Sequence, residues 1–202
     1  MRKGVKNIIF DMGNVIIDFD PDVFMDRAQI DNKSDRELIR KEIYNSPTWV
    51  EMDMGDLDEK GMCELVKQRL PEHLHRHLED LICRWCDPLI MIKGIDDLVF
   101  ELKKAGYNLY LLSNASVMQK QYWPNVKSSI CFDGVVVSAF EHLIKPDERI
   151  YRLLLEKYEL KANECLFIDD RTVNIDAAAK LGIDTFHFEN DTEKLREYIF
   201  DE

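Results

Sequence analysis

The chain has 202 residues and lacks both a long apolar run and an excess of cations. No stretch approaches the ~20 consecutive apolar residues of a membrane span, so we expect no membrane partner. The N-terminal Met-Arg-Lys-Gly-Val-Lys-Asn runs directly into an apolar strand, which leaves no room for a signal peptide and favours a cytoplasmic protein. Lys and Arg number 27 against 39 Asp and Glu, a net charge of −12, so we expect no nucleic-acid partner.

Cysteine and histidine are too scattered to predict a disulfide framework or a zinc site. The five cysteines are odd in number and lie in apolar segments, as reduced thiols do: Cys63, Cys83, Cys86, Cys131 and Cys165. Cys83 and Cys86 have the spacing of a redox or metal pair, but no second pair completes such a site. His73 and His77 lie one helical turn apart, as zinc ligands could, but the lack of a nearby third ligand favours a solvated helix face.

The chain does contain a repeated alternation of short apolar runs and amphipathic segments. The apolar runs predict strands over about residues 6–11, 108–112, 135–137, 165–168 and 185–188. Helical patterns cover 95–104 and 146–158, and a third runs through Ala177 to Gly182. This rhythm predicts an α/β fold, a doubly wound parallel sheet with right-handed crossovers.

A long segment interrupts this rhythm after the first strand. Residues 21–87 have helical character and few strand signals. A capping box at Ser34 and Glu37 predicts one helix, and two more are predicted over 57–70 and 78–86. We therefore predict an α/β core domain of residues 1–20 and 88–202, with an inserted helical domain over residues 21–87.

Polar residues close the predicted strands or lie in the adjacent loops: Asp11, Ser113, Asn114, Lys145, Asp169 and Asp170. A parallel sheet gathers its strand ends along one edge, where the ligands of open α/β sheets bind. Each piece alone has an ordinary explanation, because Asp-x-Gly-Asn and Ser-Asn are common in turns and Asp-Asp is a common N-cap. Together, and in this order, they fit a phosphoryl-transfer site.

In such a site Asp11 would attack phosphorus and form an aspartyl-phosphate intermediate, which divides one difficult displacement into two. Asp11 and one of Asp169 and Asp170 would hold Mg²⁺, a hard cation that takes oxygen ligands. The Ser-Asn pair would donate hydrogen bonds to the phosphate. Lys145 would neutralise the phosphate and restrain the repulsion among the carboxylates.

These segments resemble the four motifs of the haloacid dehalogenase-like hydrolase superfamily: Asp11-Met-Gly-Asn-Val, Leu112-Ser113-Asn114, Lys145-Pro146-Asp147 and Ile168-Asp169-Asp170. The resemblance covers almost the whole chain and implies that the insertion is a cap of the first cap class, which excludes water from the sheet edge. The Phe-Asp-x-Gly-Asn-Val opening is similar to that of bacterial alpha-D-glucose-1-phosphate phosphatases and implies sugar phosphates as substrates. The implied roles are catalysis by Asp11 and Lys145, phosphate binding by Ser113, Asn114 and Lys145, and metal binding by Asp11, the Gly13 carbonyl and Asp170, with Asp169 in support.

One position departs from the superfamily's pattern. Its phosphatases usually carry a second aspartate two residues after the nucleophile, where it protonates the leaving group, and here that residue is Gly13. Such a general acid is typically worth about 10²–10⁴ in rate. The chain could act on esters that need little protonation, such as anomeric sugar phosphates, or take an acid from the cap. It could instead be a catalytically weak phosphoryl-ligand-binding or regulatory protein.

A metal-independent 2-haloacid dehalogenase is a third alternative, because these members of the superfamily also lack the second aspartate. The adjacent acids Asp169 and Asp170 would repel a carboxylate substrate, which favours the phosphatase. The sequence thus predicts a Mg²⁺-dependent phosphatase of small phosphate esters, as a monomer or homodimer. Substrate preference is expected from the loop Met52–Asp58 and from Trp49, although Trp49 and Trp85 also fit the core of the cap.

Overall fold

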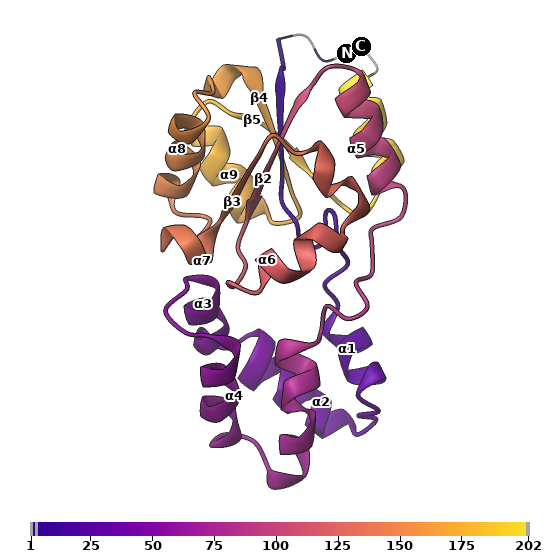
Figure 1. The fold of residues 1–202 in the computed structure, drawn as a ribbon, viewed down its shortest axis with the longest axis vertical. Helices are drawn as coiled ribbons and strands as arrows, with labels where there is room; N and C mark the ends of the chain where they lie inside the picture. The colour runs from indigo at the N-terminus through magenta and orange to yellow at the C-terminus, as the bar shows by residue number, and fades with distance from the viewer. Residues whose placement is uncertain (1, 3, 201–202) are drawn as a thin grey trace.

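The computed structural model describes residues 2 and 4–200. Its centre is a parallel five-stranded sheet with the order β3-β2-β1-β4-β5 (Figure 1). The strands are β1 (Asn7–Phe10), β2 (Asn108–Ser113), β3 (Gly134–Val137), β4 (Cys165–Asp169) and β5 (Asp184–His187). This arrangement confirms the predicted α/β fold, and all five predicted strands are present with ends that shift by a residue or two.

The pairing register brings the carboxyl ends of the three central strands to one level. Phe10 of β1 pairs with Leu111 of β2 on one side and with Ile168 of β4 on the other. The chain passes outward from β1 in both directions, through β2 to β3 and through β4 to β5. The point where the order reverses is where open α/β sheets bind ligands, and Asp11 directly follows β1 there.

Helices cover both faces of the sheet (Figure 1). One face carries α5 (Ile95–Lys104) and α10 (Thr192–Phe200), and the other carries α8 (Glu148–Lys157) and α9 (Thr172–Lys180). Within β1, Ile8 and Phe10 belong to one apolar core and Ile9 to the other, as the two-residue period of a strand requires. Two short helices, α6 (Gln119–Tyr122) and α7 (Ser138–Glu141), lie near the carboxyl edge of the sheet.

The segment after β1 forms a separate helical layer beyond that edge (Figure 1). It contains α1 (Pro21–Arg27), α2 (Lys33–Ile39), α3 (Pro47–Asp53) and α4 (Glu59–Lys67), with shorter helical segments at Arg40–Tyr44, Glu72–His77 and Glu79–Cys83. The predicted start at Ser34 is wrong, because Asn32 caps α2 by accepting a hydrogen bond from the Asp35 amide at 3.1 Å. The helix predicted over 57–70 is shorter, since the Asp58 side chain caps it by accepting from the Gly61 amide.

The cysteine and histidine patterns form no metal centre in the described part of the chain. The Sγ atom of Cys83 lies 4.0 Å from that of Cys63 in α4. His73 pairs with Asp35, and His77 accepts a hydrogen bond from Arg76. Among residues 2 and 4–200, the one cluster of groups suited to a metal is acidic and lies at the sheet edge. None of the helices described there has the length and apolar character needed to cross a bilayer.

Candidate active site

Asp11 occupies the centre of the sheet edge, with 7% of its surface exposed. Its backbone amide donates to the Ile168 carbonyl at 2.8 Å, which fixes it beside β4. Its Oδ1 atom accepts a hydrogen bond from the Met12 amide at 2.7 Å and lies 2.7 Å from the Lys145 ammonium. Neither contact occupies Oδ2. Burial raises the pKa of Asp11, and the Lys145 charge opposes that rise.

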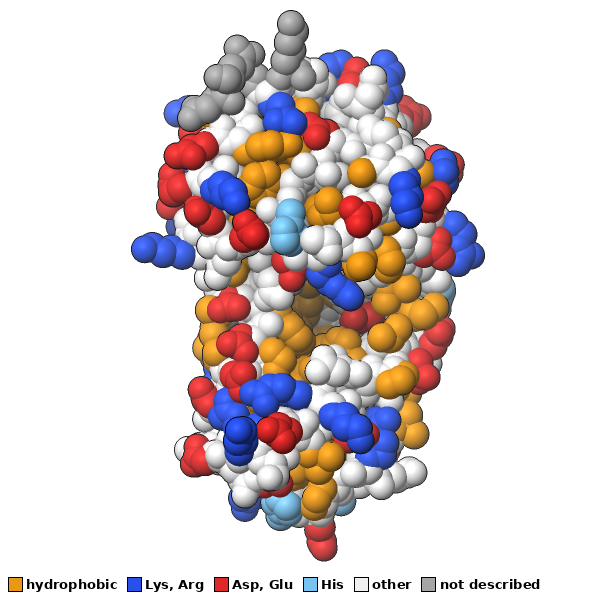
Figure 2. Space-filling model, turned by 180° about the vertical axis from the view of Figure 1, so that it is seen from behind, with side chains coloured by type: hydrophobic (Ala, Val, Ile, Leu, Met, Phe, Trp, Pro, Cys, Tyr) orange, Lys and Arg blue, Asp and Glu red, His pale blue; other side chains and the backbone are white. Residues whose placement is uncertain are grey.

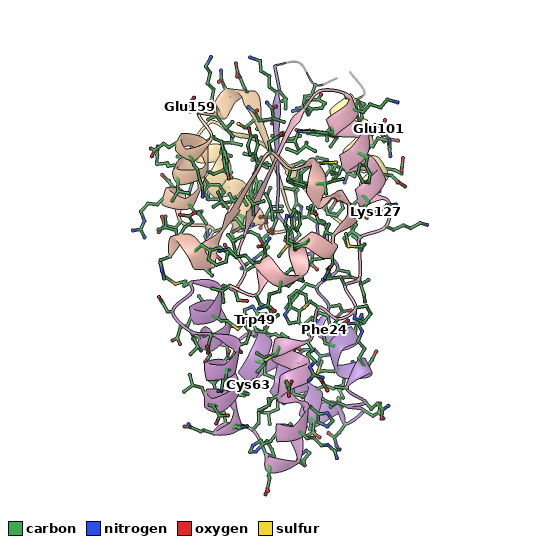
Figure 3. The ribbon with its side chains drawn as sticks, viewed as in Figure 1. Phe24, Trp49, Cys63, Glu101, Lys127 and Glu159 are labelled. Carbon is green, nitrogen blue, oxygen red and sulfur yellow. The ribbon has the colours of Figure 1, made fainter. Side chains whose placement is uncertain are left out.

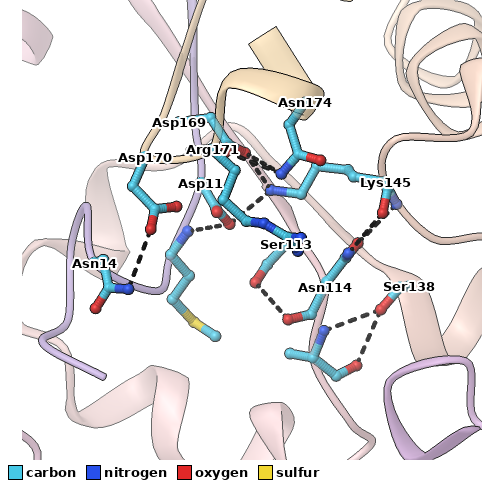
Figure 4. Close-up of polar contacts among 12 residues, drawn as sticks. Asp11, Asn14, Ser113, Asn114, Ser138, Lys145, Asp169, Asp170, Arg171 and Asn174 are labelled. Carbon is cyan, nitrogen blue, oxygen red and sulfur yellow. Dashed lines mark hydrogen bonds and ion pairs between the residues drawn. The ribbon is translucent and has the colours of Figure 1, made fainter. Parts of the chain in front are cut away.

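Lys145 comes from the loop between α7 and α8 and bridges two acids (Figure 4). Its Nζ atom lies 2.7 Å from Asp11 Oδ1 and 2.7 Å from Asp169 Oδ2, and 2% of the residue is exposed. Burial opposes the charged form, but the two carboxylates outweigh it, so the pKa of Lys145 is raised. Lys145 is therefore a buried cation that holds the predicted nucleophile in place.

Asp169 and Asp170 have different surroundings although they are adjacent. Asp169 is fully buried, and its carboxylate accepts hydrogen bonds from the Asn174 side chain at 2.9 and 3.1 Å and from the Arg171 amide at 2.9 Å. With Lys145 also bound, the Asp169 carboxylate has more contacts within the protein than that of Asp170. Asp170 is half-buried, and its Oδ2 atom accepts one hydrogen bond, from the Asn14 side chain at 3.1 Å. Burial raises the pKa of Asp170, and the Asn14 bond opposes this.

Ser113 ends β2 and Asn114 follows it at the sheet edge, as predicted from the strand order. Ser113 is buried at the end of the strand. The Asn114 side chain is bound to the Lys145 backbone at both ends, because its Oδ1 accepts from the Lys145 amide at 2.8 Å and its Nδ2 donates to the Lys145 carbonyl at 3.0 Å. This amide therefore fixes the loop that carries the lysine, whereas phosphate binding by Ser113 and Asn114 stays a prediction.

The donor set at the sheet edge fits a hard divalent cation. Asp11, Asp169 and Asp170 each offer an oxygen atom, and these three atoms lie within 4.8 Å of one another. Three carboxylates with one ammonium leave an excess of negative charge. The Oδ1 atom of Asn174 is a buried acceptor with no hydrogen-bond partner among the described residues, so a hydrated cation would also supply the donor that it lacks. Oxygen-only surroundings of this kind are typical of Mg²⁺ sites.

A cavity of about 1110 Å³ opens above these residues, between the sheet edge and the helical layer. Figure 2 shows the hollow and the hydrophobic side chains that line it. Its aromatic residues form a connected group, with ring centroids 4.9–5.5 Å apart in the pairs Phe19–Trp85, Tyr44–Trp49, Trp85–Tyr122 and Phe19–Trp49. Trp49 lies on the side of the helical layer that faces the sheet (Figure 3). Trp49 and Trp85 thus pack against aromatic neighbours, as expected of the cap core, and they also line the cavity, whereas a role of Trp49 in substrate preference stays a prediction.

Several cavity residues have no signal in the sequence. Asn14 lies within the first motif, but its left-handed backbone, with φ of 55°, and its bond to Asp170 depend on the fold. Asn174 lies one helical turn beyond the acids, and Arg171 is exposed at the rim of the cavity. Asp53 also lines the cavity, although its sequence Met-Asp-Met-Gly reads as an ordinary loop.

The chain resembles known proteins at the level of family and of sequence. A model of the haloacid dehalogenase-like hydrolase family matches residues 5–182. A D-ribitol-5-phosphate phosphatase of Bacteroides thetaiotaomicron is 27% identical over 200 residues, covering 92% of this chain and 93% of the relative. A sesquiterpene phosphatase of Aspergillus oryzae is 26% identical over 196 residues, covering 90% and 89%.

Solved structures share the fold. One is a family enzyme of Bacteroides thetaiotaomicron in complex with magnesium and inorganic phosphate, with a TM-score of 0.75 at 20% identity over 95% of this chain and 98% of that one. Another is the L-2-haloacid dehalogenase of Xanthobacter autotrophicus, with a TM-score of 0.64 at 18% identity over 90% and 76%. The chain therefore shares its fold both with a family enzyme solved with magnesium and phosphate and with a dehalogenase, so the fold alone does not distinguish the alternatives considered from the sequence.

Proposed function

The chain belongs to the haloacid dehalogenase-like hydrolase family, and we propose that within it the chain is a Mg²⁺-dependent phosphatase of small phosphorylated metabolites. The observation that carries this proposal is the cluster of three carboxylates around Lys145 at the floor of the cavity. Phosphatases are also among the relatives that match most of the chain.

In the proposed reaction, a carboxylate oxygen of Asp11 attacks the phosphorus atom and the bond to the ester oxygen breaks. The resulting aspartyl phosphate is hydrolysed by water, which releases phosphate and restores the carboxylate. Lys145 holds Asp11 in position and offsets the charge of the incoming phosphate. Mg²⁺, held by Asp11, Asp170 and the Gly13 carbonyl with Asp169 in support, would neutralise the phosphate oxygens when bound.

Residues 21–87 would act as the cap of this enzyme, over a core of residues 1–20 and 88–202. The cavity is enclosed by both parts, so a bound ester would have its phosphate at the sheet edge and its body against the helical layer. Water would be excluded from the reacting atoms, which strengthens the electrostatic interactions there. We also propose a cytoplasmic location, since the five cysteines are free thiols, and a monomer or homodimer as the assembly.

Two substrate classes are compatible with the cavity. Sugar or polyol phosphates are the first proposal, because the opening motif resembles enzymes of that class and a relative is named for ribitol 5-phosphate. The aromatic group around Phe19 favours a second, in which the phosphate is carried by an apolar body such as an isoprenoid chain. Rings of this kind can contact either the C–H face of a sugar or a hydrocarbon.

The dehalogenase alternative is less compatible with the floor of the cavity. A 2-haloacid would bring its carboxylate toward the half-buried Asp170, next to Asp169 and Asp11. Like charges so close to one another are costly unless a cation lies among them. The same acids are what a phosphatase with Mg²⁺ requires.

A panel of phosphate esters, assayed with Mg²⁺ and with a chelator, tests the proposal. It contains sugar phosphates, ribitol 5-phosphate, an isoprenoid phosphate and p-nitrophenyl phosphate, with a 2-haloacid as the control. We expect phosphate release that requires Mg²⁺, and no halide release. Halide release in chelator would establish a dehalogenase, and saturable ligand binding without turnover would establish a binding or regulatory protein.

A further inference from the structure

Asp53 is the acidic residue of the helical layer that lies deepest in the cavity wall. It is the last residue of α3, it is half-buried, and it lines the same cavity as Asp11 and Lys145. Glu51, two residues earlier, also lines the cavity but is exposed. Asp53 is thus an acid of the insertion that lines the cavity onto which Asp11 and Lys145 open.

The sheet edge holds the Asp53 backbone in place. Its carbonyl accepts a hydrogen bond from the Ser138 hydroxyl at 2.5 Å, and the same hydroxyl oxygen accepts from the Ala115 amide at 2.9 Å. Ala115 directly follows the Ser113-Asn114 pair, so Asp53 is connected by one side chain to the proposed phosphate-binding loop.

A close approach at Gly55 fixes the rest of this turn. Gly55 has a φ of 77°, and a Cβ atom there would lie 2.2 Å from the Ala139 carbonyl oxygen, so only glycine fits. Asp56, the next residue, pairs with His142 across the same contact. The turn that carries Asp53 is therefore seated on the core and does not hang free over the cavity.

The in-line geometry of phosphoryl transfer requires a proton donor on the side of the helical layer. In phosphoryl transfer the attacking and leaving oxygens lie roughly in line with the phosphorus atom. Asp11 attacks from the sheet edge, so the leaving oxygen points toward the helical layer. On the core side, Gly13 has no side chain to offer a proton.

Four other proton donors that line the cavity are engaged or unsuitable, and Asp170 is assigned to the metal. The Tyr44 hydroxyl donates to the Leu81 carbonyl at 3.0 Å, and Lys145 is bound between two carboxylates. Burial raises the pKa of Tyr122 far above neutrality, which makes it a weak acid. Arg171 does not release a proton in proteins.

Building on the proposed phosphatase function, we propose that Asp53 is the general acid and base that replaces the aspartate missing at position 13. As the phosphorus–oxygen bond breaks, its electron pair passes to the leaving oxygen, which takes the proton of the Asp53 carboxyl group and departs as the alcohol. The Asp53 carboxylate then takes a proton from the water that attacks the aspartyl phosphate, which regenerates the starting protonation state.

The surroundings of Asp53 suit this role. Burial raises the pKa of Asp53 to about 7, with Lys145 opposing the rise and Glu59 adding to it. Glu59, at the start of α4, itself accepts a hydrogen bond from the Ser116 hydroxyl of the core. A carboxyl group with a pKa near the working pH can both give and take a proton.

The test is the dependence of rate on the leaving group. Wild type, Asp53→Asn and the matched control Glu51→Gln are assayed with Mg²⁺ on p-nitrophenyl phosphate, phenyl phosphate and an alkyl phosphate. Asp53→Asn should lower kcat/KM on the alkyl ester by ~10²-fold or more, and on p-nitrophenyl phosphate by less than about tenfold, because nitrophenolate leaves without a proton. Glu51→Gln should keep the wild-type dependence of kcat/KM on the leaving group. Wild-type kcat on the alkyl ester should also fall as the pH rises above about 7, because Asp53 then loses the proton that it donates, and this fall should be absent in Asp53→Asn.

Thermal unfolding and inhibition by inorganic phosphate check that Asp53→Asn is folded and still binds the product. If Asp53→Asn lost kcat/KM equally on all three esters, or kept the wild-type dependence on the leaving group, the role of Asp53 would be overturned and the proposed phosphatase function would stand. The role would also be overturned if Glu51→Gln, and not Asp53→Asn, changed the dependence of kcat/KM on the leaving group. If wild type released no phosphate from any ester, the proposed function itself would fail.

Discussion

The clearest structural prediction concerns Lys145, because two buried carboxylates depend on its charge. Lys145→Met keeps an unbranched side chain of similar length but removes the ammonium that lies 2.7 Å from Asp11 and from Asp169. Asp169 would retain its hydrogen bonds from Asn174 and the Arg171 amide, whereas Asp11 would retain the Met12 amide. Asp11 is therefore the group that should take up a proton in the variant.

The cost can be bounded in two ways. Removing one partner of a buried ion pair destabilises a protein by about 3–5 kcal/mol. Proton uptake by a carboxyl with an unfolded pKa of about 3.9 costs about 1.4 kcal/mol for each pH unit above that value. We therefore expect Lys145→Met to lose about 3–5 kcal/mol at pH 8. Proton uptake would cost about 5.7 kcal/mol at pH 8 but only about 2.9 kcal/mol at pH 6, so the loss at pH 6 should be about 3 kcal/mol or less, because the folded variant then binds a proton that the unfolded chain does not.

Urea unfolding in chelator, at pH 8 and at pH 6, measures this difference without a metal. Lys194→Met is a suitable control, since its ion pair with Glu189 is more than half exposed and should contribute little to stability. A loss that is the same at both pH values, or one no larger than that of the control, would refute the view that Lys145 offsets buried charge.

Four further outcomes follow from the site. Asp11→Asn should stay folded but retain less than a tenth of the phosphate-release rate, because an amide cannot attack phosphorus; a variant above that level would exclude covalent catalysis by this residue. Chelation should abolish phosphate release, Mg²⁺ should restore it, and Asp170→Asn should reduce it severely; full activity in chelator would contradict the metal site. Substitutions in residues 52–58 other than Asp53 and Gly55 should change the preferred ester more than the rate on an aryl phosphate, and equal losses on all esters would mean that the loop is structural. An added Cβ at Gly13 would be 4.0 Å from its nearest neighbour, so Gly13→Asp should fold. When Gly13→Asp is combined with Asp53→Asn, it should restore alkyl-phosphate turnover by up to ~10²-fold. An absence of rescue would count against the view that the two positions can supply the same general acid.

Local sequence patterns were sufficient for the sheet and for the residues that end its strands. Asp11 and Asp169 follow short runs of large apolar residues, and a parallel sheet places such ends together whatever the connections are. The helix α10 and the short turns of 115–131 were not predicted, because they are held by contacts with the core more than by their own periodicity. Likewise, the pattern favours Ser34 as a cap, but the extended backbone at Asn32 decides where α2 begins.

The cavity wall could not be predicted because its residues meet only through the fold. Asp53 and Ser138 are 85 positions apart, and Asn14 and Asp170 are 156 apart. The segment of residues 52–55, Met-Asp-Met-Gly, contains no pattern that indicates contact with residues 137–139, Val-Ser-Ala. The loop over 52–58 was expected to affect substrate preference from its place in the insertion, but its seating on Ala139 is a property of the folded chain.

If the general acid lies on the insertion and not on the loop of Asp11, proton transfer depends on the contact between the insertion and the core. An aspartate at position 13 would lie on the same loop as the nucleophile and would be present however the insertion was seated. Asp53 lies in the cavity wall because Ser138 and Ala139 hold its turn against the core. A substrate whose body prevented that contact would lose its proton donor as well as the exclusion of water. Discrimination among esters with poor leaving groups should therefore be expressed in kcat, because the lost interaction acts in the transition state and not in binding alone.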